Sequence, residues 1–143
     1  MNPERAATRI TYSIEPGLAV DEFVAVLHAS GLAERRPVAN PETIRRMVEN
    51  ANLIVCARDA DGKLVGVARS VTDFAYCCYL SDLAVDRALQ RQGIGRELMR
   101  RTRVAAGPGS IVLLLSAPAA MAYYPHAGLD PVTNAFGFPR ETG

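Results

Sequence analysis

The sequence has few cysteines and histidines, and this scarcity excludes several kinds of site. Its 143 residues include three Cys, two His and no Trp. A structural zinc site needs about four Cys or His ligands at short, fixed spacings, and no such pattern is present, so we expect no bound metal. Cys56, Cys77 and Cys78 all fall in apolar segments. We expect them to be reduced, buried thiols of a cytoplasmic protein.

Long hydrophobic runs and an excess of one charge are also missing. No segment approaches the roughly 18 consecutive apolar residues of a membrane span, and Met1 to Arg9 lacks the apolar centre of a signal peptide. Lys and Arg total 16 against 15 Asp and Glu. We therefore expect no membrane contact and no general attraction to nucleic acid. Hydrophobic residues make up 49% of the chain, which suits a single domain over residues 1–143.

The first third of the chain predicts one strand and two helices. Alternating apolar residues predict a strand over Arg9–Ile14. Asp21 can cap a first helix, which should run from the next residue and end at Gly31. Asn40 can cap a second helix, with Pro41 at its first position.

The middle of the chain predicts three strands followed by a helix. The strands should cover Leu53–Arg58, Lys63–Thr72 and Tyr76–Val85, and form an antiparallel meander. The helix should run from about Gly93 to Ala106, because apolar residues recur there at helical spacing.

The last third predicts two more strands around a short helix. Five aliphatic residues, Ile111–Leu115, are typical of a central strand covered on both faces. A helix should follow from Ser116 to Tyr124 and be closed by Pro125, before a final strand over Pro131–Phe138. The resulting order, β-α-α-β-β-β-α-β-α-β, indicates an α+β (mixed α/β) fold.

The segment from Leu83 to Arg96 carries the strongest chemical signal. It passes from a strand through a loop with Gly93 and Gly95 into a helix. Backbone N–H groups at a helix start are unpaired and partly positive, and glycines let a phosphate approach them closely. With the charges of Arg91 and Arg96, the loop predicts an anion site.

Two well-known phosphate loops do not fit this segment. A mononucleotide P-loop ends in Gly-Lys-Ser or Gly-Lys-Thr, whereas this loop has Gly95-Arg96-Glu97. A dinucleotide fingerprint needs Gly or Ala where Leu98 stands, and a parallel βαβ unit in place of a meander. A pair of glycines could also form a turn that binds nothing, so the loop alone leaves its ligand open.

Two motifs together resemble the GNAT (Gcn5-related N-acetyltransferase) superfamily. Gln90-Arg91-Gln92-Gly93-Ile94-Gly95 is similar to its Q/R-x-x-G-x-G/A pyrophosphate loop, and Leu83-Ala84-Val85-Asp86 looks like its fourth strand. Tyr123-Tyr124-Pro125-His126-Ala127-Gly128-Leu129 resembles its aromatic-Tyr-x-x-x-Gly-Phe segment. The element order also matches, so the resemblance covers nearly the whole chain. It implies a mostly antiparallel central sheet that is splayed between the fourth and fifth strands.

The resemblance implies an enzyme that uses acetyl-CoA as co-substrate. The fourth strand would offer its backbone to pantetheine, and the loop would hold the pyrophosphate. The residues so implied are Leu83, Ala84, Val85, Gln90, Arg91, Gln92, Gly93, Ile94, Gly95, Arg96 and Tyr123.

The resemblance also implies catalytic groups. Tyr124 stands where many members keep the tyrosine that protonates the leaving thiolate. For the base that deprotonates the amine, Asp82 is the first candidate, with Asp73 and His126 as alternatives. Deprotonation relayed through water is the further possibility.

The acceptor is expected to be a primary amine of a small molecule, an amino acid or a peptide, attacking directly in a ternary complex. Its site should draw on Arg35, Arg36, Arg69, Asp73, Tyr76 and Tyr79. Two alternatives remain open: a non-catalytic acyl-CoA-binding regulatory module, and a toxin that acetylates aminoacyl-tRNA. The second is disfavoured by the small net charge. Members of the superfamily are often dimers, so a homodimer is possible.

Overall fold

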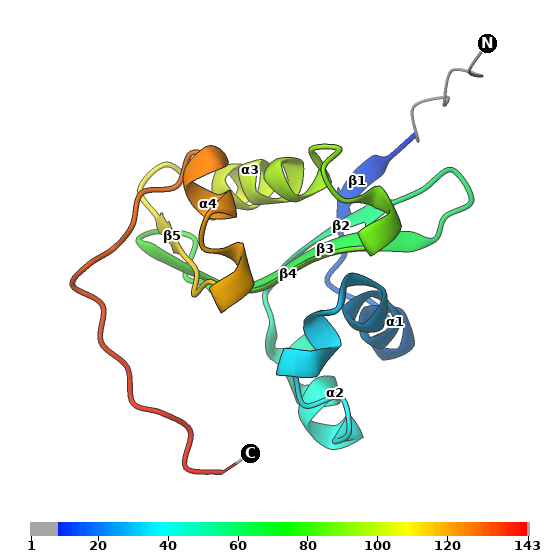
Figure 1. The fold of residues 1–143 in the computed structure, drawn as a ribbon, viewed down its shortest axis with the longest axis horizontal. Helices are drawn as coiled ribbons and strands as arrows, with labels where there is room; N and C mark the ends of the chain where they lie inside the picture. The colour runs from blue at the N-terminus through cyan, green and yellow to red at the C-terminus, as the bar shows by residue number, and fades with distance from the viewer. Residues whose placement is uncertain (1–8, 143) are drawn as a thin grey trace. The chain divides into compact units, whose positions relative to one another are not determined.

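A five-stranded sheet with helices on both faces dominates the structure, a computed structural model that describes residues 9–142 (Figure 1). The described residues divide into two units, one ending at Leu113 and one beginning at Leu114. The strands follow one another across the sheet in chain order. They are β1 (Thr11–Ile14), β2 (Leu53–Arg58), β3 (Leu64–Thr72), β4 (Cys77–Val85) and β5 (Ile111–Leu113). All neighbouring pairs are antiparallel except β4 with β5, which is parallel.

The helices of the first unit lie on both sides of the sheet. Helix α3 covers one face, and α1 and α2 cover the other (Figure 1). The helical segments of the whole chain are α1 (Val20–Ser30), η1 (Leu32–Arg35), α2 (Pro41–Asn50), η2 (Arg87–Leu89), α3 (Ile94–Ala106), η3 (Pro118–Ala120) and α4 (Tyr123–His126). The predicted α+β class, the antiparallel meander and the helix after it are confirmed.

Two of the three predicted helix-end signals act as expected. The Asn40 side chain accepts a hydrogen bond from the N–H of Thr43 at 3.2 Å, with Pro41 opening α2. Gly31 ends α1 in the left-handed conformation, with φ of 87°. The prediction for Asp21 was wrong. Helix α1 begins one residue before it, after Ala19, so Asp21 lies in the first turn, where its charge favours the helix dipole.

The C-terminal predictions needed more correction. Strand β5 stops at Leu113 and lies at the edge of the sheet, so it is not a central strand covered on both faces. The predicted helix from Ser116 is split into η3 and α4, and Pro125 lies inside α4, where the first turn of a helix needs no proline N–H.

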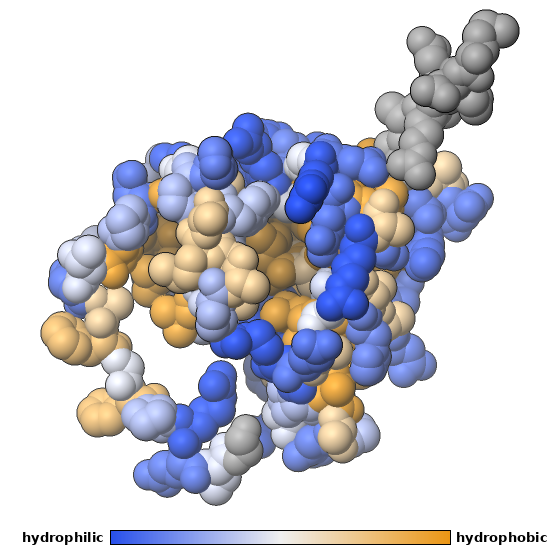
Figure 2. Space-filling model, in the orientation of Figure 1, coloured by the Kyte–Doolittle hydropathy of each residue, from blue (hydrophilic) through white to orange (hydrophobic). Residues whose placement is uncertain are grey.

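The predicted last strand, residues 131–138, does not form in the structure. The residues from Pro131 onward are exposed, and Phe136 is 99% exposed. Figure 2 shows hydrophobic side chains along this extended segment. A strand needs a partner for its backbone groups, and apolar alternation cannot supply that partner.

The cysteines only partly follow the prediction of buried thiols. Cys56 and Cys78 are buried, and burial raises the pKa of each thiol, that of Cys56 to about 12. Cys77 is exposed, because it starts β4 on the opposite side of the strand from Cys78. Among the described residues no group of three or more His, Cys, Asp or Glu could hold a metal. No helix within residues 9–142 is long and apolar enough to cross a membrane.

Candidate active site

The loop before α3 has an unusual backbone. Arg91 and Gly93 both have positive φ, 66° and 85°, and α3 begins directly afterwards at Ile94. A non-glycine residue rarely adopts this conformation, so Arg91 is held there by its surroundings. A Cβ added to Gly93 would meet nothing within 4 Å, so the space above the helix start is open.

The first turn of α3 presents N–H groups toward this open space. The first backbone hydrogen bond at the helix start joins the Glu97 N–H to the Gly93 carbonyl at 3.0 Å. The N–H groups of Ile94 and Gly95 precede it and have no partner in the helix ladder. The helix dipole, the positive-φ turn and the exposed Arg91 are features that suit the binding of an anion.

Close packing fixes the position of this helix start against the sheet. Ile94 and Leu98 are buried, and both contact β3 at Gly66. A Cβ at Gly66 would lie 3.1 Å from Leu98 Cδ1 and 3.2 Å from Ile94 Cγ2. The missing side chain therefore lets α3 approach the sheet, and α3 brings its first turn to the end of β4.

One edge of β4 lacks a neighbouring strand over most of its length. The parallel pairing with β5 ends at the pair Tyr79 and Leu113, whereas β4 continues to Val85. Among residues 9–142 no other strand pairs with that edge. The predicted parting of the fourth and fifth strands is thus present.

The backbone of Leu83 and Val85 faces this unpaired edge. The N–H of Asp86 donates to the Val65 carbonyl in β3 at 2.8 Å. Backbone groups alternate in direction along a strand, so those of Leu83 and Val85 point away from β3. An edge of this kind binds an extended ligand as it would bind another strand.

Gln90 joins the unpaired edge to the loop. Its side-chain amide donates to the Val85 carbonyl at 3.0 Å, so that carbonyl already has one protein partner. The Asp86 side chain accepts from the Ala88 N–H at 2.9 Å and caps η2. The structure thus brings the predicted cofactor residues of β4, the loop and α3 together at one end of the sheet.

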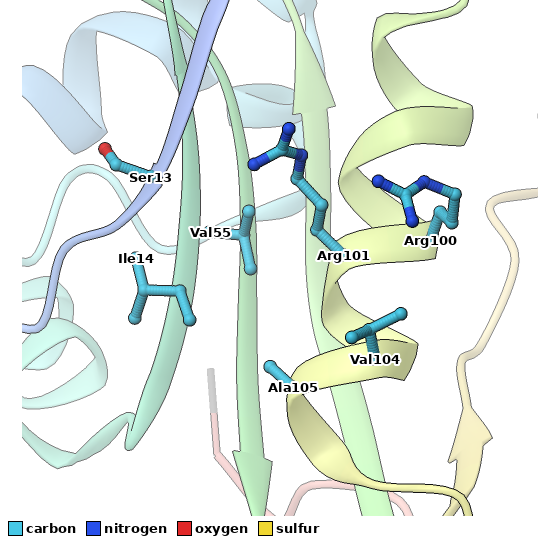
Figure 3. A pocket seen from close by; sticks show the side chains of 7 residues that line it. All are labelled: Ser13, Ile14, Val55, Arg100, Arg101, Val104 and Ala105. Atoms are coloured by element: carbon cyan, nitrogen blue, oxygen red, sulfur yellow. The ribbon is translucent and has the colours of Figure 1, made fainter.

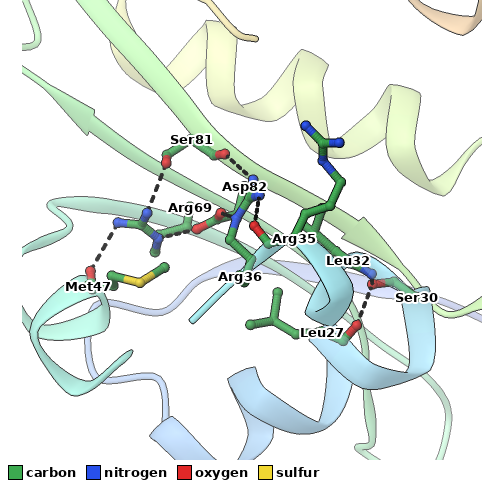
Figure 4. A network of polar contacts seen from close by, with 9 residues as sticks. All are labelled: Leu27, Ser30, Leu32, Arg35, Arg36, Met47, Arg69, Ser81 and Asp82. Carbon is green, nitrogen blue, oxygen red and sulfur yellow. Dashed lines mark hydrogen bonds and ion pairs between the residues drawn. The ribbon is translucent and has the colours of Figure 1, made fainter. Parts of the chain in front are cut away.

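Asp82 lies in a buried ion-pair network (Figure 4). Its side chain is completely buried, and its two oxygens accept from Arg36 and Arg69, one each. Arg69 also donates to the Ser81 hydroxyl and the Met47 carbonyl, at 3.0 Å and 3.1 Å. A general base needs an oxygen free to take a proton from an amine. Both oxygens of Asp82 are paired with guanidinium groups. This arrangement suits a structural ion pair better than a general base.

Asp73 caps the turn between β3 and β4. One oxygen, Oδ1, accepts from the N–H groups of Ala75, Tyr76 and Cys77 at 2.7 to 3.0 Å. These hydrogen bonds hold the pKa of Asp73 well below its usual range. A carboxylate with so low a pKa is a weak proton acceptor at neutral pH.

The predicted acceptor residues divide into two groups. Arg36 is turned toward Asp82, whereas Arg35 is exposed and points away from that network (Figure 4). Tyr79 is 40% exposed and lies where β4 and β5 part. Arg35 and Tyr79 are therefore open to a substrate, and Arg36 has protein partners.

The second motif forms α4 in the second unit. Tyr123 and Tyr124 contact each other edge to face, with ring centroids 5.2 Å apart. The Tyr124 carbonyl accepts from the Leu129 N–H at 3.1 Å, and Gly128 follows the helix with φ of 93°. The glycine of the motif is therefore required by a left-handed turn. Tyr124 is half-buried, and His126 is exposed.

A surface pocket lies elsewhere, between β1, β2 and the second half of α3 (Figure 3). Its volume is about 350 Å³, and apolar side chains with two arginines, Arg100 and Arg101, line it. Both arginines pair with Glu97, at 2.7 and 2.8 Å, and lower its pKa to about 2. This pairing offsets part of the positive charge of Arg100 and Arg101. The pocket contains none of the predicted site residues.

Sequence reasoning did not detect the pairing of Arg69 and Arg36 with Asp82. A signal was present for one partner. Arg69 stands in an apolar strand, and a buried arginine requires an acidic partner. The antiparallel register places Asp82 directly opposite Arg69. Arg36 had no comparable signal, because it reaches Asp82 from a loop.

Comparisons with known proteins agree with this geometry. The profile of the "Acetyltransferase (GNAT) family" matches residues 20–128. A search of curated proteins gave no match.

Among solved structures, a protein of Deinococcus radiodurans R1 named as an acetyltransferase is 26% identical, with a TM-score of 0.72 over 96% of this chain and 92% of its own. A GNAT-family acetyltransferase of Streptococcus pneumoniae TIGR4 is 22% identical, with a TM-score of 0.71 over 93% and 100%. An aminoglycoside acetyltransferase from an uncultured soil sample, in complex with sisomicin, is 20% identical, with a TM-score of 0.64 over 94% and 97%.

Proposed function

The chain belongs to the acetyltransferase (GNAT) family, and on that premise we propose that it transfers an acetyl group from acetyl-CoA to a primary amine. The family implies acetyl transfer from an acyl-CoA. The choice of an amine nitrogen as acceptor, and the roles of individual residues, are our proposal.

One observation supports the proposal most directly. The open helix start at Gly93 and the unpaired edge at Leu83 and Val85 adjoin each other at one end of the sheet. The first suits a pyrophosphate and the second suits an extended amide-containing arm, the two parts of coenzyme A that differ most in chemistry. The left-handed backbone of Arg91 adds support, because such conformations cluster at ligand-binding loops.

The binding roles follow from these groups. N–H groups of the loop and the first α3 turn, with Arg91 and Arg96, would hold the pyrophosphate. Backbone groups of Leu83 and Val85 would pair with the pantetheine arm, as in β-strand addition. An N–H near Leu83 would stabilise the oxyanion that forms as the amine attacks the thioester carbonyl.

The proton transfers involve two further groups. We assign Tyr124 the role of general acid that donates its hydroxyl proton to the departing thiolate. For the amine, we favour deprotonation through water, because Asp82 is buried between two arginines and Asp73 has a lowered pKa. The attack itself would be direct, with no covalent enzyme intermediate.

The acceptor would approach the unpaired edge near Tyr79. Arg35 directly precedes Arg36 in the chain and is exposed. Its guanidinium would contact an anionic group of the acceptor. The soil enzyme that binds sisomicin shows that this fold accommodates amine-rich small molecules, so aminoglycosides belong in the set of acceptors to be tested.

The test is binding followed by turnover. CoA and acetyl-CoA would be titrated by calorimetry, and free thiol would then be followed with pooled amines, including amino acids, peptides and aminoglycosides, and separately with aminoacyl-tRNA. We expect micromolar binding and amine-dependent thiol release. Arg103→Gln should bind and turn over like the unmodified chain, because Arg103 is exposed on the last turn of α3, far along the helix from the loop.

The outcomes separate the competing functions. Binding without thiol release for every amine would favour the non-catalytic acyl-CoA-binding module. Release only with aminoacyl-tRNA would favour the toxin. No binding of CoA at all would contradict the proposal, because the loop from Gln90 to Arg96 would then be only a turn.

A further inference from the structure

A bulge in β4 coincides with the point where this strand leaves β5. Arg69 is paired with Asp82 across the two strands, but the next residue of β3, Ser70, is paired with Leu80. Ser81 is therefore the extra residue of β4. The last pair between β4 and β5 is at Tyr79, just before the bulge. A bulge bends a strand and increases its twist, so it turns the following residues away from the former neighbour.

Two arginines hold the polar groups of this bulge. The Arg36 Nη2 group donates to the Ser81 carbonyl at 3.0 Å, and the Arg69 Nη2 group donates to the Ser81 hydroxyl at 3.0 Å. The Nε group of each arginine donates to Asp82. Each guanidinium therefore bridges the bulged residue and the residue after it.

Each arginine is also fixed to a second element. Arg36 donates to the Arg35 carbonyl at the end of η1, at 2.8 Å. Arg69 donates to the Met47 carbonyl in α2, at 3.1 Å. The bulge is thus connected to the helical segments on the α1 and α2 face of the sheet.

The burial of these charges indicates a directional role. The Asp82 side chain is fully buried, and those of Arg69 and Arg36 are only 8% and 22% exposed. Apolar residues of similar volume often stabilise a core as well as a buried ion pair does, so such a pair is weak evidence of stabilisation. A planar guanidinium fork does fix the angle between its two acceptors, which apolar packing cannot do.

We propose that Arg36 and Arg69, acting through Asp82 and Ser81, are positioning residues for acetyl-CoA. They hold the bulge, and the bulge sets the direction in which Leu83 and Val85 present their backbone groups. The inference rests on the proposed function, because it concerns the edge that would bind the pantetheine arm. Neither arginine touches the reacting atoms.

The experiment compares two substitutions of Arg36, which is less buried than Arg69. Substituting Arg36 still leaves Asp82 paired with Arg69. Arg36→Met removes both sets of hydrogen bonds and keeps most of the side-chain length. Arg36→Lys keeps the charge beside Asp82 but loses the planar fork. Arg45→Gln is the control, because Arg45 pairs with Glu42 and Glu49 on the exposed face of α2.

Three quantities are measured for each variant: the melting temperature, the Kd for CoA by calorimetry well below that temperature, and amide exchange over residues 79–86 and 53–58. We expect Arg36→Met to raise the Kd about tenfold and to speed exchange in 79–86 alone. Arg36→Lys should recover most of the melting temperature but not the affinity. Arg45→Gln should match the unmodified chain.

Other results would overturn the inference. A lower melting temperature with unchanged Kd would show a merely structural role, as would full recovery of affinity by Arg36→Lys. If Arg36→Met does not fold, Arg36→Lys alone decides: a raised Kd for CoA supports the inference, and an unchanged Kd overturns it. Failure of the unmodified chain to bind CoA would reject the proposed function instead. The exchange data would then decide whether Arg36 holds the bulge. Unchanged exchange over residues 79–86 in Arg36→Met would reject the role of Arg36 in holding the bulge as well.

Discussion

Arg91 combines two properties that can be separated by mutation. Its backbone is left-handed, which costs an L-residue about 1–2 kcal/mol, and its exposed guanidinium stands beside the proposed pyrophosphate site. Strain kept at an exposed position is typical of a functional loop. The charge is therefore expected to strengthen CoA binding, whereas the backbone strain lowers the stability of the fold.

Arg91→Gly is expected to stabilise the fold and weaken CoA binding. Glycine removes the strain and should raise the free energy of unfolding by about 1 kcal/mol. Loss of the charged donor should raise the Kd for CoA about tenfold, since a hydrogen bond to a charged group contributes about 1.5–3 kcal/mol. Urea unfolding and calorimetry measure the two effects. Phe74→Gly is the control, because Phe74 has φ of 59° in the β3–β4 turn. It should leave the Kd unchanged.

The arrangement of the two predicted bases, Asp82 and Asp73, leads to a prediction on pH. If water accepts the amine proton, kcat/KM should rise with pH along the pKa of the acceptor itself. An acceptor with an α-amino group, of pKa about 8, should give an inflection roughly two units below that of a lysine side chain, of pKa about 10.4. The same inflection for both acceptors would contradict deprotonation through water and point to a group of the protein as the base.

At the scale of elements, side chains at the ends of strands join β1, β2 and α1. Arg58, at the end of β2, pairs with Glu15 after β1 and with Glu22 in α1, at 2.8 Å and 2.7 Å. Hydrogen bonds from Arg58 lower the pKa of both carboxyl groups. These three residues stabilise the packing of α1 on the sheet edge.

Arg58→Met is expected to make stability less sensitive to acid. A carboxyl group with a lowered pKa stabilises the fold fully above its ordinary pKa, about 4.3. That contribution is lost as the pH falls through the lowered value. Without Arg58, Glu15 and Glu22 have nearly ordinary pKa values, so the free energy of unfolding should fall less between pH 7 and pH 3. Urea unfolding at both pH values tests this. Arg103→Met, on an exposed position of α3, should retain the full dependence.

The contact between α3 and β3 gives a second prediction at this scale. Gly66→Ala places a methyl group too close to Ile94 and Leu98, and overpacking of this kind costs about 1–3 kcal/mol. In a Leu98→Ala background the same change should cost clearly less, because the nearest atom is gone. Gly17→Ala is the control, since its added Cβ would meet nothing within 4 Å. Equal losses in both backgrounds would contradict the packing argument.

At the scale of the whole molecule, the proposed roles are divided between the two units. The groups proposed to bind the pyrophosphate and the pantetheine arm belong to the unit ending at Leu113, whereas Tyr124 and the predicted cofactor residue Tyr123 belong to the unit beginning at Leu114. Binding and proton donation should therefore respond separately to mutation. That residues 1–143 act as one domain remains a prediction from sequence.

Tyr124→Phe tests this division of roles. Removing the hydroxyl should lower kcat at least about 100-fold, the lower range for general acid catalysis. The Kd for CoA should stay within about twofold, because the binding groups are elsewhere. Tyr12→Phe removes a hydroxyl from β1 and should leave both quantities unchanged. A rise in Kd with unchanged kcat would assign Tyr124 to cofactor packing.

The sequence by itself determined those features that depend on neighbouring residues. Helix caps at Asn40 and Gly31, the strand alternation of the meander and the glycines before α3 all act over a few residues. The motif from Gln90 to Gly95 was also readable, because its chemistry comes from consecutive backbone groups. These local signals sufficed for the fold class and the family, and the cofactor loop stays a prediction.

Only the tertiary structure decided the features that depend on distant partners. The burial of Asp82 between Arg36 and Arg69 needs side chains from a loop and two strands. The exposed segment after Pro131 and the position of β5 at the sheet edge depend on which backbone groups find partners. Ion pairing and strand pairing are interactions at long sequence separation, and periodicity in one segment carries no information on what lies opposite it.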